Sequence, residues 1–318
     1  MNVKRAVKNQ IDIFNMLKRS KANDKLSHAY LFYGNEGCGK VEMAYALACL
    51  LYCPNGGCLE CETCKTILES NHLNVDYIGL LEKKTMISKE QTEALQEEFS
   101  KTSLVEGTRI YIVDGIDIAT SAAQNSLLKF IEDPINKTPT IGIFIANEIS
   151  NVVPTIKSRC VIQYFKDIPL DVRVNELVDM GNNKLDAILS SILTNNIEES
   201  MNIMAQENFS LIKESFLEFI SINKQKDMVL FNLKYSSLYR QNNNLLILLK
   251  WLLQFIEDTF NTNLILTPLC DKINVYSKRD KEELRRLFSL VLGLFDKLKS
   301  NVNSSTILFE LTSNFITQ

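Results

Sequence analysis

The sequence predicts an α/β domain built around a glycine-rich phosphate-binding loop, followed by a second half that is entirely helical. Three observations lead to this fold class. Short apolar runs alternate with helical patterns up to about residue 165, as expected for a parallel sheet covered on both faces. Residues 34–40, GNEGCGK, match the G-x-x-x-x-G-K pattern of a P-loop. From about residue 166, apolar residues recur at helical spacing without a convincing strand.

The first elements surround the glycine loop. Residues 29–33, AYLFY, predict a short buried strand directly before the loop, and VEMAYALACLLY directly after it predicts a helix. Residues 76–80, DYIGL, are a weaker strand candidate. The stretch SKEQTEALQEEF predicts a helix that begins with a capping box, because Ser88 is followed three residues later by Gln91.

Two further strands lie beyond that helix. RIYIVD at 109–114 predicts a buried strand, and IGIFIAN at 141–147 predicts another. Between them, Thr120 is placed to cap a helix and Pro134 to end it. Strands that alternate with helices in this way imply a parallel sheet.

Composition and hydropathy exclude several classes of protein. A net charge of -3 and a pI near 5.7 argue against a large nucleic-acid-binding surface, because neutralising many phosphates requires excess Lys and Arg. The N-terminal residues lack the continuous apolar segment of a secretory signal. The stretch LLILLKWLLQFIED from Leu245 is too short to span a membrane and contains Lys250. We therefore expect a cytoplasmic protein without membrane contact.

Half of the eight cysteines fall within one short phrase, CPNGGCLECETC. In a reducing cytosol, thiols at such close spacing are better explained by a metal than by disulfides. Four thiolates at tetrahedral reach suit zinc, and a closed thiolate shell leaves no open position for catalysis. The sequence therefore predicts a structural zinc site, with these ligands: Cys53, Cys58, Cys61 and Cys64.

The glycine loop has a context that fits a nucleotide pocket but lacks two groups that ATP hydrolysis needs. Val41 stands where a Ser or Thr would hold magnesium, and Gly115 stands where an acidic residue would orient water. We therefore expect a pocket that does not hydrolyse ATP, and weak nucleotide binding stays open. The candidate pocket residues are Gly34, Gly39, Lys40 and Asp114.

Several stretches together carry a resemblance to a known family. They are SHAYLFYGNEGCGK, the four-cysteine insert, NHLNVDYI, ISKEQTEALQEEF, RIYIVDGIDIATSAAQNSLLKFIEDP, VVPTIKSRC and NVNSSTILFEL. In this order they resemble the delta-prime subunit family of the bacterial DNA polymerase III clamp loader, a catalytically silent part of the AAA+ group. The resemblance implies a RecA-like AAA+ domain with the zinc module (1–165), an all-α lid (166–206) and an all-α collar for oligomerisation (207–318).

The resemblance also implies a role for the Ser-Arg-Cys triplet at 158–160. In the family, this motif sends its arginine to the ATP of a neighbouring subunit, so Arg159 is implied to be an arginine finger that acts in trans. A guanidinium can bridge phosphate oxygens and stabilise charge during phosphoryl transfer. The implied partners are gamma/tau ATPases and delta, with the sliding clamp and primed DNA reached through the complex. The chain would not be an enzyme on its own.

One departure from the family pattern concerns the zinc loop. The gap between Cys53 and Cys58 is short, so His72 is a candidate substitute ligand, although we expect His72 to pack beneath the sheet. Two alternative functions remain open. One is an active ATPase like gamma/tau that tolerates Val41, and the other is a zinc-containing P-loop adaptor unrelated to replication.

Overall fold

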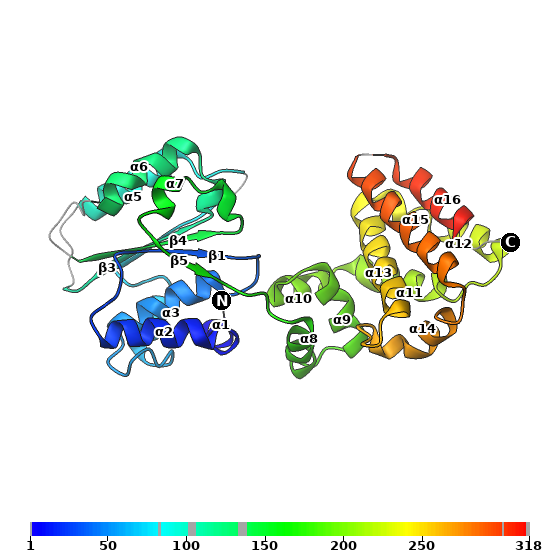
Figure 1. The fold of residues 1–318 in the computed structure, drawn as a ribbon, viewed down its shortest axis with the longest axis horizontal. Coiled ribbons are helices and arrows are strands. Elements are labelled where there is room, and N and C mark those ends of the chain that lie inside the picture. The colour runs from blue at the N-terminus through cyan, green and yellow to red at the C-terminus, as the bar shows by residue number, and fades with distance from the viewer. Residues whose placement is uncertain (1, 82–83, 101–105, 133–138, 301, 316–318) are drawn as a thin grey trace. The chain divides into compact units, whose positions relative to one another are not determined.

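The computed structural model describes residues 2–81, 84–100, 106–132, 139–300 and 302–315. The chain divides into two compact units, Met1–Ile168 and Pro169–Gln318, which are drawn in Figure 1. The first unit contains every β-strand among the described residues, and the second is helical.

The first unit is built on a five-stranded parallel sheet with the order β2-β3-β4-β1-β5. Central β1 pairs with β4 on one side and with β5 on the other, with Tyr33 opposite both Ala146 and Tyr164. The strands are β1 (Ala29–Tyr33), β2 (Val75–Ile78), β3 (Arg109–Asp114), β4 (Thr140–Ala146) and β5 (Val161–Tyr164).

Helices cover both faces of this sheet, as Figure 1 shows. On one face, α1 (Val3–Asn9), α2 (Ile11–Ala22) and α3 (Lys40–Tyr52) bury a cluster of apolar residues, joined by α4 (Glu62–Leu68). On the other face, α5 (Lys89–Ser100), α6 (Ser121–Glu132) and the short α7 (Pro154–Lys157) bury a second cluster. The 3-10 turns η1 (Ile116–Ile118) and η2 (Ile149–Asn151) follow β3 and β4.

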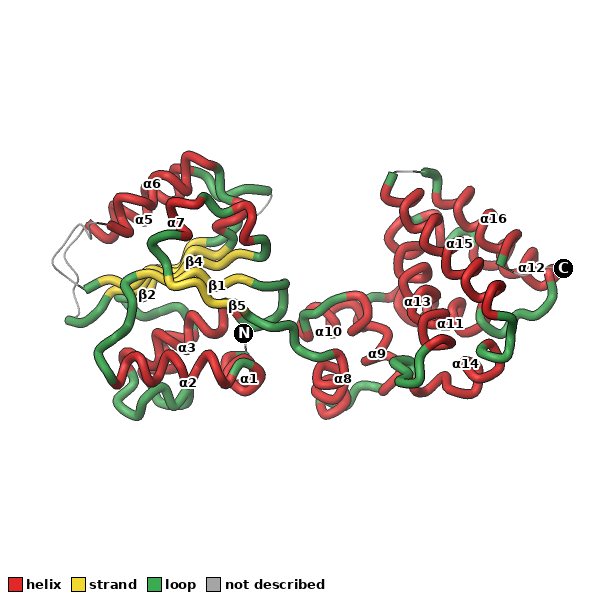
Figure 2. Tube along the Cα trace, viewed as in Figure 1, coloured by secondary structure: helices red, strands yellow, loops and turns green. Residues whose placement is uncertain are grey.

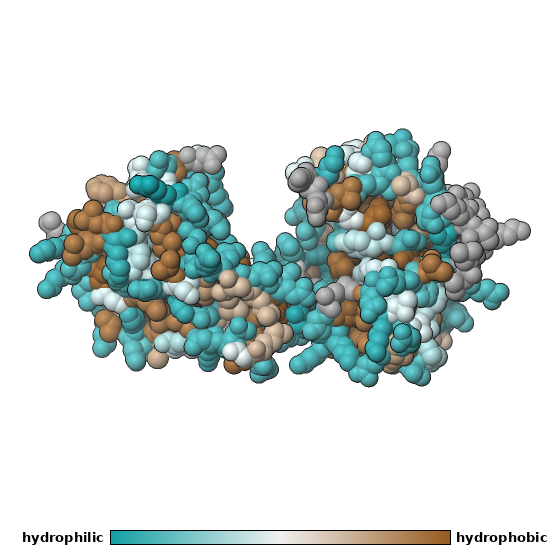
Figure 3. Space-filling model, turned by 180° about the vertical axis from the view of Figure 1, so that it is seen from behind, coloured by the Kyte–Doolittle hydropathy of each residue, from teal (hydrophilic) through white to brown (hydrophobic). Residues whose placement is uncertain are grey.

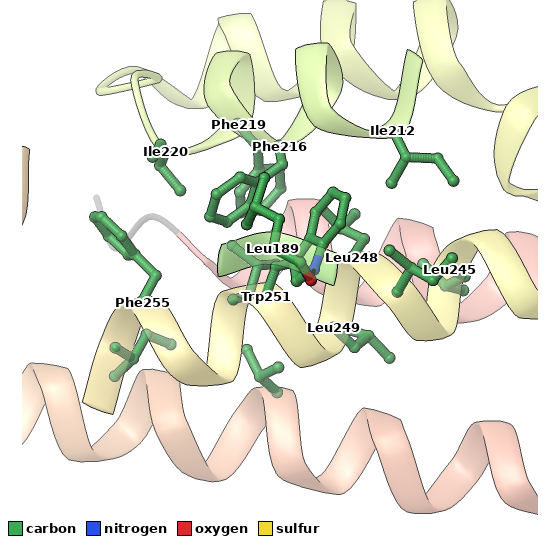
Figure 4. Packing of buried hydrophobic residues seen from close by; sticks show 14 of the residues in the cluster. Leu189, Ile212, Phe216, Phe219, Ile220, Leu245, Leu248, Leu249, Trp251 and Phe255 are labelled. Atoms are coloured by element: carbon green, nitrogen blue, oxygen red, sulfur yellow. Dashed lines mark hydrogen bonds between the residues drawn. The ribbon is translucent and has the colours of Figure 1, made fainter. Parts of the chain in front are cut away.

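The second unit contains only helices and turns among its described residues (Figure 2). Its buried apolar residues form one continuous cluster from Val174 to Phe315, and the fully buried Trp251 lies within it beside Phe216 and Leu189 (Figure 4). The elements are α8 (Leu170–Asp179), α9 (Lys184–Leu193), α10 (Ile197–Ala205), α11 (Glu207–Phe219), α12 (Gln225–Tyr235), η3 (Leu238–Arg240), α13 (Asn242–Phe260), η4 (Thr267–Leu269), α14 (Cys270–Tyr276), α15 (Lys281–Lys299) and α16 (Ser304–Asn314).

The four strands expected from the sequence are confirmed, and so are the helix boundaries at two caps. The Ser88 amide donates to the Gln91 side chain at 3.1 Å, and Thr120 accepts from the Ala123 amide at 3.2 Å. Pro134, predicted to end a helix, lies outside the described residues.

The sequence interpretation missed β5 and the N-terminal helices α1 and α2. β5 is a four-residue edge strand whose side chains are largely exposed, so it lacks the continuous apolar run of its neighbours. In α1 and α2, charged residues interrupt the apolar stripe. None of the described helices is long and apolar enough to cross a membrane. Hydrophilic residues cover most of the face seen in Figure 3.

Candidate functional site

The glycine loop lies between β1 and α3, as the pattern requires. Gly39 is the N-cap of α3 and has a left-handed φ of 92°. A Cβ at this position would stand 2.9 Å from the Cβ of Ala6 in α1, closer than two such carbons pack. Gly39 is therefore fixed both by its backbone conformation and by the helix packed on it.

The ammonium of Lys40 bonds to the glycine loop itself. The side chain is buried, and Nζ donates to the carbonyl oxygens of Gly34 at 2.7 Å and Asn35 at 2.6 Å. A third bond reaches Asn147 Oδ1 at 2.9 Å. An ammonium has three donors, so these three oxygens use its hydrogen-bonding capacity within the protein. Any phosphate would have to displace them.

The two positions that lack catalytic groups also have structural roles here. Val41 is partly buried and packs against the core of the first unit. Gly115 has a left-handed φ of 94°, and a Cβ there would come within 3.0 Å of Ile118 Cγ1. An acidic side chain at Gly115 would therefore strain the backbone as well as crowd η1.

Asp114 ends β3 and is held by a phenol. Tyr77 of β2 donates its hydroxyl to Asp114 Oδ2 at 2.8 Å. Burial raises the pKa of Asp114 above the ordinary range of an aspartic acid, and the Tyr77 bond and the Lys40 charge oppose that rise. Burial also raises the pKa of Tyr77, so the phenol stays protonated as the donor.

Sequence reasoning missed several residues that organise this pocket. Asn147 directly follows β4 and binds Lys40, and Asp117 accepts the backbone amides of Asn147 at 2.9 Å and Glu148 at 2.8 Å. Asn147 could have been predicted, because it is a polar residue directly after a buried strand, and the carboxyl ends of parallel strands lie on the same side of the sheet. Gln10 bridges Cys38 O and Lys166 O, and no pattern indicated it or Tyr77.

The four predicted cysteines come together at one place, between α3 and α4. Their Sγ atoms all lie within 4.8 Å of one another, with Cys53 at 3.5 Å from Cys58 and 3.7 Å from Cys61. A tetrahedral zinc with bonds of about 2.3 Å places its sulfurs about 3.8 Å apart. The group, which also includes Cys64, could therefore hold a metal ion.

Backbone amides prepare this group for thiolates. The Cys58 amide points at Cys53 Sγ, and the Cys61 amide points at Cys58 Sγ, both at 3.4 Å. The bond from Cys58 is the largest cause that lowers the pKa of Cys53 to about 6. Burial raises the pKa of Cys64, a cost that a bound cation would offset. The donor set fits a soft metal such as zinc.

His72 does not belong to the cysteine group. Its ring packs against Tyr52 with centroids 4.3 Å apart and the ring planes tilted by 42°, and its Nδ1 accepts from the Asn74 amide at 3.3 Å. Burial lowers the pKa of His72, so the neutral imidazole acts as a packing group. Cys53 instead lies with Cys58, Cys61 and Cys64 in the group that could hold a metal ion.

Arg159 lies between α7 and β5, with 36% of its side chain exposed. Its Nε donates to Glu132 Oε1 at 2.5 Å, and Nη2 pairs with the same oxygen. Its Nη1 donates to Thr155 O at 2.9 Å and to Ser158 Oγ at 3.3 Å. Glu132 is the last residue of α6 and was not singled out from the sequence.

The structure does not bring Arg159 to the glycine loop. Arg159 precedes β5 at its amino end, whereas Gly34 follows β1 at its carboxyl end, and the two strands run in parallel with Tyr30 opposite Val161 and Tyr33 opposite Tyr164. At about 3.3 Å per residue, these ends are separated by about 10 Å along the strands alone. The arginine therefore lies at the amino ends of these parallel strands, and the loop lies at their carboxyl ends.

Comparisons with known proteins agree on one family. The model of the family described as DNA polymerase III, delta subunit, matches residues 9–169. DNA polymerase III subunit delta' of Bacillus subtilis is 34% identical over 220 residues, which are 67% of this chain and 65% of that protein. DNA polymerase III subunit gamma/tau of Mycobacterium tuberculosis is 32% identical over 149 residues, 46% of this chain and 25% of that protein. The chain thus covers less than two thirds of either relative.

A solved structure extends the likeness in fold across both units. A DNA polymerase III, gamma subunit-related protein from Thermotoga maritima matches with a TM-score of 0.50 at 14% identity, over 94% of this chain and 97% of that chain. At this identity the likeness concerns the fold alone. The predicted fold class, an α/β domain with a P-loop on a parallel sheet followed by helices, is confirmed.

Proposed function

The chain belongs to the delta-prime family of DNA polymerase III, and on this premise we propose that it is a clamp-loader subunit that does not hydrolyse ATP itself. In this role it supports ATP-dependent loading of the sliding clamp onto primed DNA, together with gamma/tau ATPases and delta. ATP is hydrolysed by its neighbours. The cysteine group carries a structural zinc, and the helical lid and collar join the subunit to the assembly.

The state of the pocket supports the absence of hydrolysis. Lys40 is bound to three oxygens of its own chain, and Asp114 is bound to Tyr77. Catalysis of phosphoryl transfer depends on a lysine and a metal that contact the phosphates. Here both anchoring groups have partners within the protein, and an acidic side chain at Gly115 would strain the backbone and crowd Ile118.

One observation carries the proposal that Arg159 acts on another subunit. Arg159 precedes β5 and the glycine loop follows β1, so they lie at opposite ends of two neighbouring parallel strands, and the guanidinium is bonded away from the pocket of its own chain. Its position at the surface leaves it open to a neighbour. An arginine supplied in trans stabilises the charge that develops on the transferred phosphoryl group.

Reconstitution with gamma/tau and delta subunits tests this function. We expect Arg159→Ala to leave assembly intact and to lower DNA-stimulated ATP hydrolysis by the complex, because the affected site loses a factor of about 10³ or more in rate. The matched control is Arg19→Ala, which removes an exposed arginine of α2 in the same unit. Unchanged turnover with Arg159→Ala would rule out the finger role, and failure to assemble at all would favour an adaptor unrelated to replication.

A further inference from the structure

The contacts of Arg159 leave little of its guanidinium for a phosphate. A guanidinium has five N–H groups. Two of them go to Glu132 Oε1 and two go to Thr155 O and Ser158 Oγ, which leaves at most one. A forked contact to phosphate oxygens requires two N–H groups on the same edge. Arg159 can make that contact only after it gives up one of its present partners.

Glu132 is the partner that a phosphate would replace. It is the only carboxylate among the described contacts of Arg159, and it occupies the edge formed by Nε and Nη2. A carboxylate and a phosphate compete for the same fork because both are anions of similar geometry. Thr155 and Ser158 belong to the same short segment as Arg159, so their bonds can persist while that edge is exchanged.

The ion pair of Arg159 and Glu132 lies at the surface of the first unit. Both side chains remain partly exposed, at 36% for Arg159 and 48% for Glu132. Ion pairs of this kind are weak and open readily in water. The pair can therefore hold the arginine in one orientation and still release it.

We propose that Glu132 is a positioning residue that stores Arg159 in the free subunit, so that the arginine is donated only when the phosphates of a neighbouring subunit displace this carboxylate. The proposal rests on the function proposed above. It assigns to Glu132 the role of restraining ATP hydrolysis at the shared site until that site is correctly assembled.

The isolated chain provides a test that does not depend on ATP hydrolysis. Phenylglyoxal modifies accessible guanidinium groups, and peptide mass spectrometry can follow its rate at Arg159. We expect Glu132→Gln, which keeps the acceptor oxygen and removes the charge, to speed this modification about two- to fivefold, the range that a surface ion pair can supply. The matched control Glu310→Gln breaks the pair with Lys297 in the second unit and should leave the rate at Arg159 unchanged. An unchanged rate in Glu132→Gln would overturn the proposal.

The reconstituted complex gives the second readout. We expect Glu132→Gln to raise ATP turnover in the absence of DNA by a similar two- to fivefold, and the double variant with Arg159→Ala to fall to the level of Arg159→Ala alone. A purely structural role predicts no such rise. If Glu132→Gln lowers turnover as Arg159→Ala does, storage is wrong. If Arg159→Ala itself has no effect, the proposed function fails, and the modification rate still decides whether Glu132 holds the arginine.

Discussion

Lys40 of the P-loop pattern bonds to its own chain in this structure. Its ammonium binds the carbonyls of Gly34 and Asn35 and the side chain of Asn147, and so ties the end of β4 to the loop after β1. A buried charge is tolerated only when its donors are satisfied. The residue that would bind phosphate in an ATPase therefore acts as an internal cross-link.

Replacing this lysine separates the two roles. We expect Lys40→Ala to lower the free energy of unfolding by about 1–3 kcal/mol, because the buried Gly34 carbonyl and the partly buried acceptors of Asn35 and Asn147 lose a charged donor. In complexes that still assemble, ATP turnover should match that of the unmodified subunit. Urea denaturation and a turnover assay measure the two effects, with the exposed Lys18→Ala as the control. A selective loss of turnover would instead favour an active ATPase of the gamma/tau kind.

The sequence motif predicted the glycine loop and its missing catalytic groups, but it could not predict the contacts between residues far apart in the sequence. Val41 and Gly115 stand at fixed spacings from Lys40 and Asp114, so their missing functional groups were visible in the sequence. Tyr77 lies 37 residues from Asp114 in the sequence, and Glu132 lies 27 residues from Arg159. Such contacts depend on how the strands and helices pack, and no local pattern encodes them.

Among the elements, the segment between α3 and α4 has no regular structure of its own. Residues 53–61 form no helix or strand, and the Sγ atoms of Cys53, Cys58 and Cys61 converge there with that of Cys64 from α4. The surface pair of Lys4 and Glu60, at 2.5 Å, adds little stability. A bound metal ion would therefore add a strong constraint to the one that Leu59 provides by packing against the core.

Metal content and metal removal test this interpretation. We expect one zinc per chain in protein purified without chelators. Removing the metal should lower the free energy of unfolding by about 4 kcal/mol where free zinc had exceeded its dissociation constant a thousandfold. Cys64→Ser should abolish binding, whereas Cys49→Ala should retain it, because Cys49 is buried next to the group without belonging to it. Equal loss of zinc in both variants would contradict the assignment.

The accuracy of the element predictions depended on burial. Strands at 29–33, 109–114 and 140–146 are almost fully buried, so their apolar runs were easy to recognise. β5 exposes Val161, Ile162 and Tyr164 at the sheet edge, and its pairing with β1 decides its conformation. A strand that depends on a partner for its structure carries a weak signal of its own.

At the scale of the whole molecule, the second unit has one core. Trp251 of α13 is fully buried, and its indole N–H donates to the Leu189 carbonyl of α9 at 2.8 Å. Phe209 and Phe216 of α11 contact the same ring, each with centroids 5.7 Å away. The apolar cluster thus includes residues from both the predicted lid and the predicted collar. The boundary between these two domains near residue 206 stays a prediction.

A single substitution tests the unity of this core. We expect Trp251→Phe to lower the free energy of unfolding of this unit by about 2–3 kcal/mol, because it leaves a cavity and removes the indole donor. Circular dichroism in urea measures the change. The control Phe309→Leu alters a side chain that is 65% exposed and should shift stability by no more than about 0.5 kcal/mol. A similar small shift for Trp251→Phe would show that the helices around it pack independently.

Arg159 and the glycine loop lie at opposite ends of the strands, so the two ends of the sheet in the first unit carry different groups. Contacts made through two different faces are heterologous, so subunits joined in this way follow one another head to tail. On the function proposed above, an arginine at one end of these strands and an internally bonded pocket at the other would let the chain complete the site of one neighbour without needing an arginine in return. The proposal then predicts that this subunit stands at one end of the row of ATPase subunits.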